Sequence, residues 1–380
     1  MSSTNLSLSP VDAWFFRDSR PYNKDEANQA GVRSLFPPHA TTVVGALRAG
    51  LARENGWNGR SRWTTSLTDV LGDGYDDLGE LDFFGPYLMR ERDSAHRPLF
   101  PAPLSLLGTK APDAKTGEPV WSPRTLLRPG KAIRCDLGDE VRMPQSALDE
   151  DGLKDPNGIW LTTDGLARVL RGEVPGPGEC IASKNLWSLE ARVGLKRKED
   201  TLTTGDGALY SPSYVRLAPG ISLGARVDGM PGAWKTPSRV PLGGESRLAN
   251  IDAIEQIELP DSPMAAIRES KRMSMTFVTP ARFDNDLLIN EVKPNQPLPD
   301  AFGELAGCTL VSACVGKPVF IGGWNSLERK PLPLEPYWPA GTTLFLEAGP
   351  DELDAALETH KQKVGQRTAY GFGQVVVGTW

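Results

Sequence analysis

The chain has 380 residues, of which 42 are lysine or arginine and 48 are aspartate or glutamate, so its formal net charge at pH 7 is −6. A protein that wraps nucleic acid by itself normally has a basic balance, so any such role must come from a local patch or from binding shared with other subunits. The 39 glycines and 33 prolines predict many loops and short strands, and the length favours two domains or one large elaborated domain.

The spacing of cysteines and histidines argues against a zinc site and against a disulfide framework. The four cysteines form no C-x-x-C pair, and the three histidines are scattered along the chain. We therefore expect no metal, no cofactor and a reducing, cytoplasmic environment. The first ten residues lack the basic and apolar segments of a signal peptide, and no apolar run approaches the roughly 20 residues that span a bilayer, so no membrane contact is expected.

The first elements in chain order are a strand and a helix. Residues 5–16 alternate loosely and end in aromatic residues, as in a central strand that buries Trp14 and Phe16. After a polar loop, "FPPHATTVVGALRAGLAREN" predicts a helix with Thr41 or Thr42 as its N-cap. This succession makes the first half of a β-α-β unit.

The middle of the chain is less regular. Residues 55–185 are rich in glycine, aspartate, proline and tryptophan, and we expect insertions with short strands and turns there. Residues 185–217 contain two β-rich arms around a polar, basic centre, which predicts a long hairpin with an exposed tip. A glycine turn and a strand ending at Pro260 follow, so we expect the first domain to span residues 1–262.

A second unit is expected over residues 263–380. "KRMSMTFVTPARF", "GCTLVSACV", "KPVFIGGW" and "GTTLFLEA" are typical of strands. "DELDAALETHKQKVG" predicts an amphipathic helix, acidic at its start, basic at its end and closed by Gly365. The chain finishes in a glycine loop and a terminal strand. These elements together predict a loop-rich α+β protein.

Two glycine loops are candidate phosphate-binding sites. In the first, Gly243 and Gly244 could let backbone N–H groups approach a phosphate, with Ser246 or Arg247 adding side-chain contacts. The alternative is a tight turn that needs positive φ.

The second glycine loop lies near the end of the chain. Gly371 and Gly373 would again bring N–H groups close to a phosphate, while Tyr370 and Phe372 offer faces on which single-stranded bases could stack. The alternatives are a tight turn and core packing of the terminal strand. A metabolic enzyme with phosphate loops would need a helix after each loop, whereas the residues after Gly373 favour a strand.

A basic run and one histidine complete the candidates. "RVGLKRKED" places Arg192, Lys196, Arg197 and Lys198 together, which suits a phosphate backbone, although such a run is more often a solvated face. His39, beside a helix N-terminus, could act as general acid or base in RNA cleavage, but the proline pair before it also suggests a rigid loop.

Six sequence blocks occur in order from residue 15 to residue 378: "FFRDSRP", "PPHATTVVGALR", "EARVGLKRKEDTLTTGDGALY", "LGGESR", "IGGWNSLERKPLPLEPYWPAGT" and "YGFGQVVVG". In these blocks the chain resembles the third subunit of the Cmr, or type III-B, CRISPR effector complex, a member of the RAMP superfamily. The family commonly has a third proline after Pro38, where this chain has His39.

The resemblance implies tandem ferredoxin-like (RRM-like) domains, with large insertions in the first, and a non-catalytic role in antiviral defence. It also implies partners: the 5′ handle of the guide RNA, the large polymerase/cyclase-like subunit and the repeating backbone subunit. Carried over to this chain, the two glycine loops become handle contacts, and the hairpin over 192–209 resembles a thumb that kinks guide RNA.

For the first block, our hypothesis is that Arg17 or Arg20 and Arg48 line the handle path, with Asp18 orienting one guanidinium. The alternative is a buried arginine–aspartate pair that only ties a strand to a loop. The rival function is a RAMP endoribonuclease that processes CRISPR repeat RNA with His39 as general acid or base.

Overall fold

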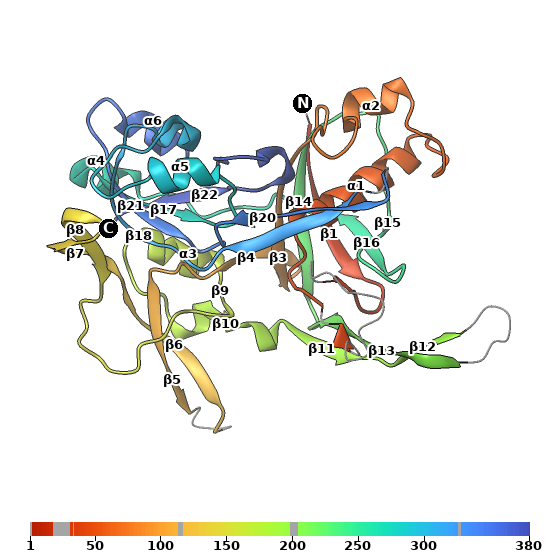
Figure 1. Ribbon diagram of the computed structural model, residues 1–380, viewed down its shortest axis with the longest axis horizontal. Helices are drawn as coiled ribbons and strands as arrows, with labels where there is room; N and C mark the ends of the chain where they lie inside the picture. The colour runs from red at the N-terminus through yellow and green to blue at the C-terminus, as the bar shows by residue number, and fades with distance from the viewer. Residues whose placement is uncertain (1, 18–30, 33, 113–116, 198–203, 326–327) are drawn as a thin grey trace.

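The computed structural model describes residues 2–17, 31–32, 34–112, 117–197, 204–325 and 328–380. Within these residues, strands outnumber helices, and both the eight-stranded sheet and the four-stranded sheet of the C-terminal part are antiparallel (Figure 1). The α+β class expected from the sequence is confirmed.

The larger sheet belongs to the N-terminal part of the chain. Its eight strands lie in the order β10 (Cys180–Ala182), β9 (Ile159–Leu161), β4 (Ala95–Pro101), β3 (Asp82–Arg92), β14 (Ile221–Met230), β1 (Ser2–Pro10), β16 (Leu248–Ala253), β15 (Arg239–Pro241). β3 lies inside the range 55–185 that we expected to be inserted, yet it pairs directly with β14 in the middle of this sheet. That expectation was therefore wrong for β3.

The first strand ends earlier than the sequence predicts. β1 stops at Pro10, and the chain then leaves the sheet and forms an isolated bridge from Trp14 to Val215. The predicted burial is confirmed, because Trp14 is 0 % and Phe16 5 % exposed. The aromatic run is thus a buried connection between two sheets.

Three helices accompany this sheet: α1 (Ala40–Glu54), α2 (Thr65–Leu71) and α3 (Thr163–Leu170). α1 buries Val44, Leu47 and Leu51, as its apolar spacing predicts, whereas Ala49, which the same spacing included, is partly exposed. Its N-cap is His39 and not Thr41 or Thr42, because extended backbone (φ −66°, ψ 149°) ends at His39 and helical geometry begins one residue later.

The smaller sheet belongs to the C-terminal part and has the order β18 (Thr309–Cys314), β21 (Thr343–Glu347), β17 (Arg272–Phe277), β22 (Val375–Gly378). Its helices are α4 (Met264–Ser270), α5 (Asn285–Asn290), α6 (Leu353–Glu358) and a 3-10 helix over Asp300–Leu305. Four strands of each sheet share one arrangement: β16-β1-β14-β3 and β22-β17-β21-β18. If the four strands are numbered by their order along the chain, their order across the sheet is fourth, first, third, second.

α6 is shorter than the helix predicted over residues 351–365. It ends at Glu358, and His360 and Lys361 turn away, with Lys361 in the left-handed region (φ 70°). The His360 ring accepts a hydrogen bond from Val377 N (3.0 Å), so this residue binds the terminal strand rather than continuing the helix.

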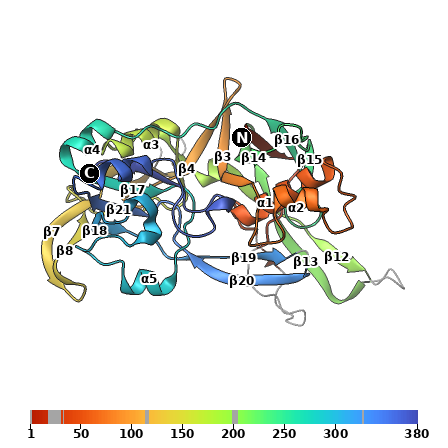
Figure 2. The same ribbon diagram turned by 90° about the horizontal axis from the view of Figure 1, so that it is seen from above.

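Four hairpins extend from the sheets. They are formed by β5 (Leu106–Pro112) with β6 (Pro119–Leu126), β7 (Arg128–Cys135) with β8 (Gly138–Gln145), β19 (Val319–Asn325) with β20 (Lys330–Tyr337), and β11 (Trp187–Ala191) and β12 (Gly194–Arg197) with β13 (Thr204–Leu217). β2 (Gly31–Val32) adds to β13 in parallel. The hairpin of β12 and β13 projects at the opposite end of the molecule from β7 and β8 (Figures 1 and 2). Short 3-10 helices lie at Pro177–Glu179, Ser183–Asn185 and Thr368–Tyr370.

The two main sheets share a core. One buried cluster contains Phe84 and Met89 from β3 together with Val278 and Val376 from the C-terminal part. Lys363 adds a polar contact, because its ammonium donates to Phe83 O (2.9 Å). The C-terminal sheet is therefore packed on the N-terminal one rather than tethered to it.

Candidate nucleic-acid interface

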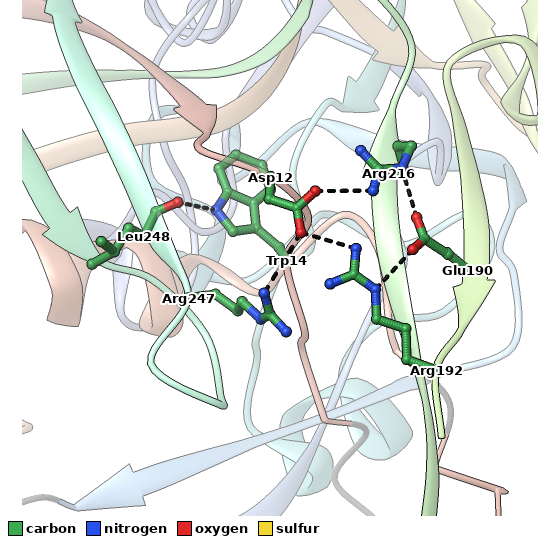
Figure 3. A network of polar contacts seen from close by, with 7 residues as sticks. All are labelled: Asp12, Trp14, Glu190, Arg192, Arg216, Arg247 and Leu248. Atoms are coloured by element: carbon green, nitrogen blue, oxygen red, sulfur yellow. Dashed lines mark hydrogen bonds and ion pairs between the residues drawn. The ribbon is translucent and has the colours of Figure 1, made fainter. Parts of the chain in front are cut away.

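The hairpin of β11, β12 and β13 meets the end of β1 at a junction fixed by backbone contacts. Val11 N donates to Leu248 O (3.1 Å), and Trp14 N donates to Val215 O (3.0 Å). The Trp14 indole also donates from Nε1 to Leu248 O (3.3 Å), as Figure 3 shows. These contacts hold Asp12 between β13 and β16.

Six polar or aromatic side chains gather at this junction, at the base of the hairpin. We call them the root cluster: Asp12, Glu190, Arg192, Tyr214, Arg216 and Arg247. They come from the segment after β1, from β11 and the residue that follows it, from β13, and from the glycine loop before β16. Segments far apart in the chain therefore build one surface.

Two carboxylates bridge the arginines of the root cluster (Figure 3). Arg192 donates from Nη2 to Asp12 Oδ2 (2.9 Å) and from Nε to Glu190 Oε1 (2.7 Å). Arg216 donates from Nη2 to Asp12 Oδ1 (2.9 Å) and from Nε to Glu190 Oε2 (2.6 Å). Arg247 Nη1 lies 3.7 Å from Asp12 Oδ2. Each hairpin arginine is thus held by both carboxylates.

The ring of Tyr214 contacts two of the arginines, Arg192 and Arg247. Its ring centroid lies 4.3 Å from the guanidinium carbon of Arg247 and 4.9 Å from that of Arg192, within the range of cation–π attraction. The ring centroid of Phe15 lies 5.6 Å from that of Tyr214, and both side chains are buried. The aromatic pair therefore orients the two guanidinium groups.

The root cluster keeps its charges at neutral pH. Hydrogen bonds from Arg192 and then Arg216 lower the pKa of Asp12, and those from Arg216 and then Arg192 lower the pKa of Glu190. The same contacts, with Glu190 first, raise the pKa of both arginines. Three guanidiniums against two carboxylates leave a local charge of +1, at side chains that are 27 to 44 % exposed for the arginines.

The first glycine loop brings Arg247 into the root cluster. A Cβ on Gly243, which has φ 84°, would lie 2.4 Å from Phe15 O, and Gly244 N donates to that same oxygen (2.7 Å). These glycines therefore permit close approach to the segment after β1, which favours the tight-turn alternative for them. Ser246 is exposed in the left-handed region (φ 50°) beside Arg247.

Other predicted basic residues lie away from this junction or outside the described residues. Arg17 is exposed and forms an isolated backbone bridge with Ser34. The backbone of Lys196 and Arg197 belongs to β12, farther out along the hairpin. Three predicted residues lie outside the described part of the chain: Asp18, Arg20 and Lys198.

Arg48 lies in the interior of the protein and not on the RNA path predicted for it. Its side chain is buried, and its guanidinium donates to the carbonyls of Gly72 (3.2 Å), Gly74 (2.8 Å) and Asp77 (2.9 Å) as well as Leu71. The predicted handle contact at Arg48 is corrected, because these donors already hold the loop after α2. Burial lowers the pKa of Arg48.

The second glycine loop is also corrected. Tyr370 and Phe372 are 5 % and 1 % exposed in the main core, so they offer no open face for a base. Gly371 N donates to Thr368 O and Gly373 N to Pro280 O, both at 2.8 Å, so these N–H groups are not available to a phosphate. The alternative of core packing and tight turns holds for this loop.

His39 is partly buried at the start of α1. Desolvation lowers the pKa of its imidazole to about 4, so the ring is neutral near pH 7. A neutral histidine has no acidic proton to donate near pH 7, so the structure argues against His39 as the general acid in RNA cleavage. Its backbone carbonyl accepts from Thr42 N (3.0 Å), as expected at an N-cap.

A family model described as CRISPR-associated protein (Cas_Cmr3) matches residues 6–380. The chain belongs to the Cas_Cmr3 family. This confirms the family recognised from the six sequence blocks and makes the chain a subunit of the type III-B, or Cmr, class of CRISPR effector complexes. No curated protein matches the chain in sequence.

Solved structures with similarity to this Cas_Cmr3 member include two of a type III-B complex. One chain of a cryo-EM structure of the type III-B Cmr-beta complex, bound to cognate target RNA and AMPPnP, has 14 % identity and a TM-score of 0.48, over 90 % of this chain and 86 % of that one. A chain of the complex bound to cognate target RNA has 14 % identity and a TM-score of 0.47 over the same shares.

Within the part of the Cas_Cmr3 chain that the structure describes, no cluster of three or more histidine, cysteine, aspartate or glutamate side chains could hold a metal. A search of the same residues finds no helix long and apolar enough to cross a membrane.

Sequence reasoning missed four members of the root cluster: Asp12, Glu190, Tyr214 and Arg216. Tyr214 and Arg216 alternate along β13, as do Glu190 and Arg192 along and just beyond β11, so each pair lies on one face. Pairing the two arms of the predicted hairpin would have placed Glu190 near Arg216. Asp12 had no such local signal, because it lies 204 residues from Arg216.

Proposed function

We propose that this chain is a non-catalytic RNA-binding subunit of a type III-B effector complex, which holds the 5′ handle of the guide RNA at the root cluster. It docks the large polymerase/cyclase-like subunit and contacts the repeating backbone subunit, in antiviral defence. The observation that supports this proposal most is the meeting of Arg192, Arg216 and Arg247 on one partly exposed surface, in a member of a CRISPR-associated family.

The chemistry of the root cluster suits an RNA backbone. Guanidinium groups bind phosphate oxygens through two parallel N–H donors, and their planes can stack on unpaired bases. Arg192 and Arg216 use Nε and Nη2 within the cluster, so donors on the Nη1 side of each guanidinium take no part in those bonds. Phosphate contacts of this kind position an RNA without reading its sequence.

The acidic net charge of −6 fits a subunit that shares RNA binding with its neighbours. Such a subunit needs one basic surface, and its other faces can form protein interfaces. Arg17 and Ser246 are exposed, and we propose that they extend the RNA path together with Lys196 and Arg197, whose backbone belongs to β12.

The fold proposed for this role is a tandem pair of ferredoxin-like domains. The order fourth, first, third, second in both antiparallel sheets supports it, as does the succession β17-α5-β18-β21-α6-β22 in the C-terminal part, into which the hairpin of β19 and β20 is inserted between β18 and β21. The N-terminal sheet contains the same order in β16-β1-β14-β3, with β4, β9 and β10 added at one edge and β15 at the other. The boundary proposed at residues 262–263 lies between β16 and α4.

Binding of labelled guide RNA to the full chain tests this function, alone and together with the large subunit. We expect RNA with an intact 5′ handle to bind more tightly than RNA with a scrambled handle, and the difference to grow when the large subunit is present. Equal binding of both RNAs in both settings would contradict handle recognition. Incubation of repeat RNA without metal checks the non-catalytic part, since specific cleavage that is lost in His39→Ala would overturn it.

A further inference from the structure

Asp12 lies within ion-pair distance of all three arginines of the root cluster. Its Oδ1 accepts from Arg216 and its Oδ2 from Arg192, both at 2.9 Å, while Arg247 lies 3.7 Å from Oδ2. Figure 3 shows the three guanidiniums converging on this one carboxylate from three sides. A carboxylate and a phosphodiester present the same kind of charged oxygen pair to a guanidinium.

We propose that Asp12 competes with an RNA phosphate for the same arginines. The ion pairs of Asp12 with these arginines must break before the arginines can bind RNA. The inference rests on the proposed RNA-binding function of the root cluster. Its consequence is selectivity: RNA that makes only backbone contacts at the cluster binds weakly, and RNA that makes further contacts elsewhere on the complex overcomes the competition.

Each of the three arginines has a further contact besides Asp12. Glu190 accepts from Nε of Arg192 (2.7 Å) and of Arg216 (2.6 Å), and the Tyr214 ring lies against Arg192 and Arg247. A carboxylate that served only to place the guanidiniums would duplicate these contacts. Removing the charge of Asp12 therefore leaves the site assembled.

Asp12 is also placed where an incoming anion would compete with it. Its side chain is 45 % exposed, so a phosphate can reach the same donors from solvent. Its backbone position is held by neighbours, through Val11 N to Leu248 O (3.1 Å) and Trp14 N to Val215 O (3.0 Å), and these bonds do not involve the carboxylate. An Asp12→Asn variant should therefore keep the local fold.

The charge balance gives the sign of the effect. Three guanidiniums and the carboxylates of Asp12 and Glu190 sum to +1, and replacing Asp12 by asparagine raises this sum to +2. Removing one negative charge at a partly exposed site strengthens the attraction of a nearby phosphate, by about three- to tenfold in affinity at moderate salt. If Asp12 instead served to hold the arginines in place, Asp12→Asn would lower the RNA affinity, because the arginines would then be displaced.

The experiment compares binding of guide RNA with intact and scrambled 5′ handles to the wild-type chain, Asp12→Asn and Asp12→Ala over a salt series. The matched control is Asp354→Asn, which removes one carboxylate from an exposed arginine pair (Arg268 Nη2 to Asp354 Oδ1, 2.8 Å) far along the chain. We expect both Asp12 variants to bind both RNAs about three- to tenfold more tightly, with a larger gain for the scrambled RNA. The control should match the wild type.

Unchanged or weaker binding in the Asp12 variants would overturn the inference. Arg192→Ala in the Asp12→Asn background tells this failure apart from failure of the proposed function. If Asp12→Asn tightens binding and Arg192→Ala abolishes the gain, competition at the cluster holds. If Arg192→Ala has no effect on RNA affinity in either background, the cluster does not bind RNA, and both the function and the inference fall.

Discussion

Gly371 lies directly against Gly85: a Cβ added to Gly371 would come within 2.4 Å of Gly85 O and 3.2 Å of Gly85 N. Gly371 also has φ 95°, a left-handed backbone that disfavours other residues. Thr279 fixes the same turn by donating from Oγ1 to Gly371 O (2.8 Å). The contact joins the last loop of the chain to β3 and so connects the two main sheets.

Gly371→Ala should therefore destabilise the protein. We expect the free energy of unfolding to fall by about 3 kcal/mol, from the strained φ and from the backbone shift that the methyl group forces. Chemical denaturation measures the change. The control is Gly45→Ala in α1, where nothing lies within 4 Å of an added Cβ and alanine should raise stability by about 0.5–1 kcal/mol. Equal effects of the two substitutions would contradict the close approach to Gly85.

Arg48 should contribute to stability and not to RNA affinity. Arg48→Met removes the donors that the carbonyls of Gly72, Gly74 and Asp77 use, and we expect a loss of about 2–4 kcal/mol. Thermal unfolding measures the loss, with Arg53→Met near the exposed end of the same helix as the control. A variant that kept its stability but lost guide-RNA binding would restore the handle contact predicted from the sequence.

His360 should make stability depend on pH below neutrality. Its Nδ1 accepts from Val377 N and its Nε2 contacts Pro260 O, both at 3.0 Å, so the folded protein needs the neutral ring with its proton on Nε2. Desolvation first, and Lys361 next, lower the pKa of His360 to about 4. The unfolded chain has a pKa of about 6.5, so it binds more protons between these values.

The stabilisation is thus complete above about pH 6.5 and is lost as the pH falls toward 4. We expect the wild type to lose about 2 kcal/mol through His360 between pH 7 and pH 5, and His360→Gln to lose correspondingly less. Denaturation at the two pH values measures both slopes. His39 keeps a residual slope in the variant, because its pKa is also lowered to about 4. Identical slopes in the two proteins would contradict the role of His360.

Local patterns in the sequence predicted much of the fold. Apolar, β-branched runs such as the one at 375–377 form strands, and Val44, Leu47 and Leu51, which the sequence places at helical spacing, lie on the buried face of α1. The ends of elements were less predictable, because tertiary contacts set them. His360 ends α6 through bonds to Pro260 and Val377, and neither partner is local in sequence.

The glycine loops show why the candidate site was only partly predictable. Gly243 and Gly371 look alike in sequence, as each lies in a glycine turn that leads to a strand. In the structure, both glycines serve close backbone approach, to Phe15 O and Gly85 O respectively. The first turn also places Arg247 beside the hairpin, where its side chain is 27 % exposed. A sequence shows that a glycine is needed, but not whether a ligand or another backbone segment requires it.

The central claim is that the root cluster holds guide RNA, and the affinity of Arg247→Ala for guide RNA with an intact 5′ handle tests it most directly. Arg268→Ala is the matched control, since Arg268 is another arginine with a carboxylate partner, Asp354. Measured over a salt series with the full chain and the large subunit, Arg247→Ala should bind about tenfold more weakly and show a smaller salt slope, by about 0.7, whereas Arg268→Ala should match the wild type. Equal affinities and equal salt slopes for the two variants would contradict the claim.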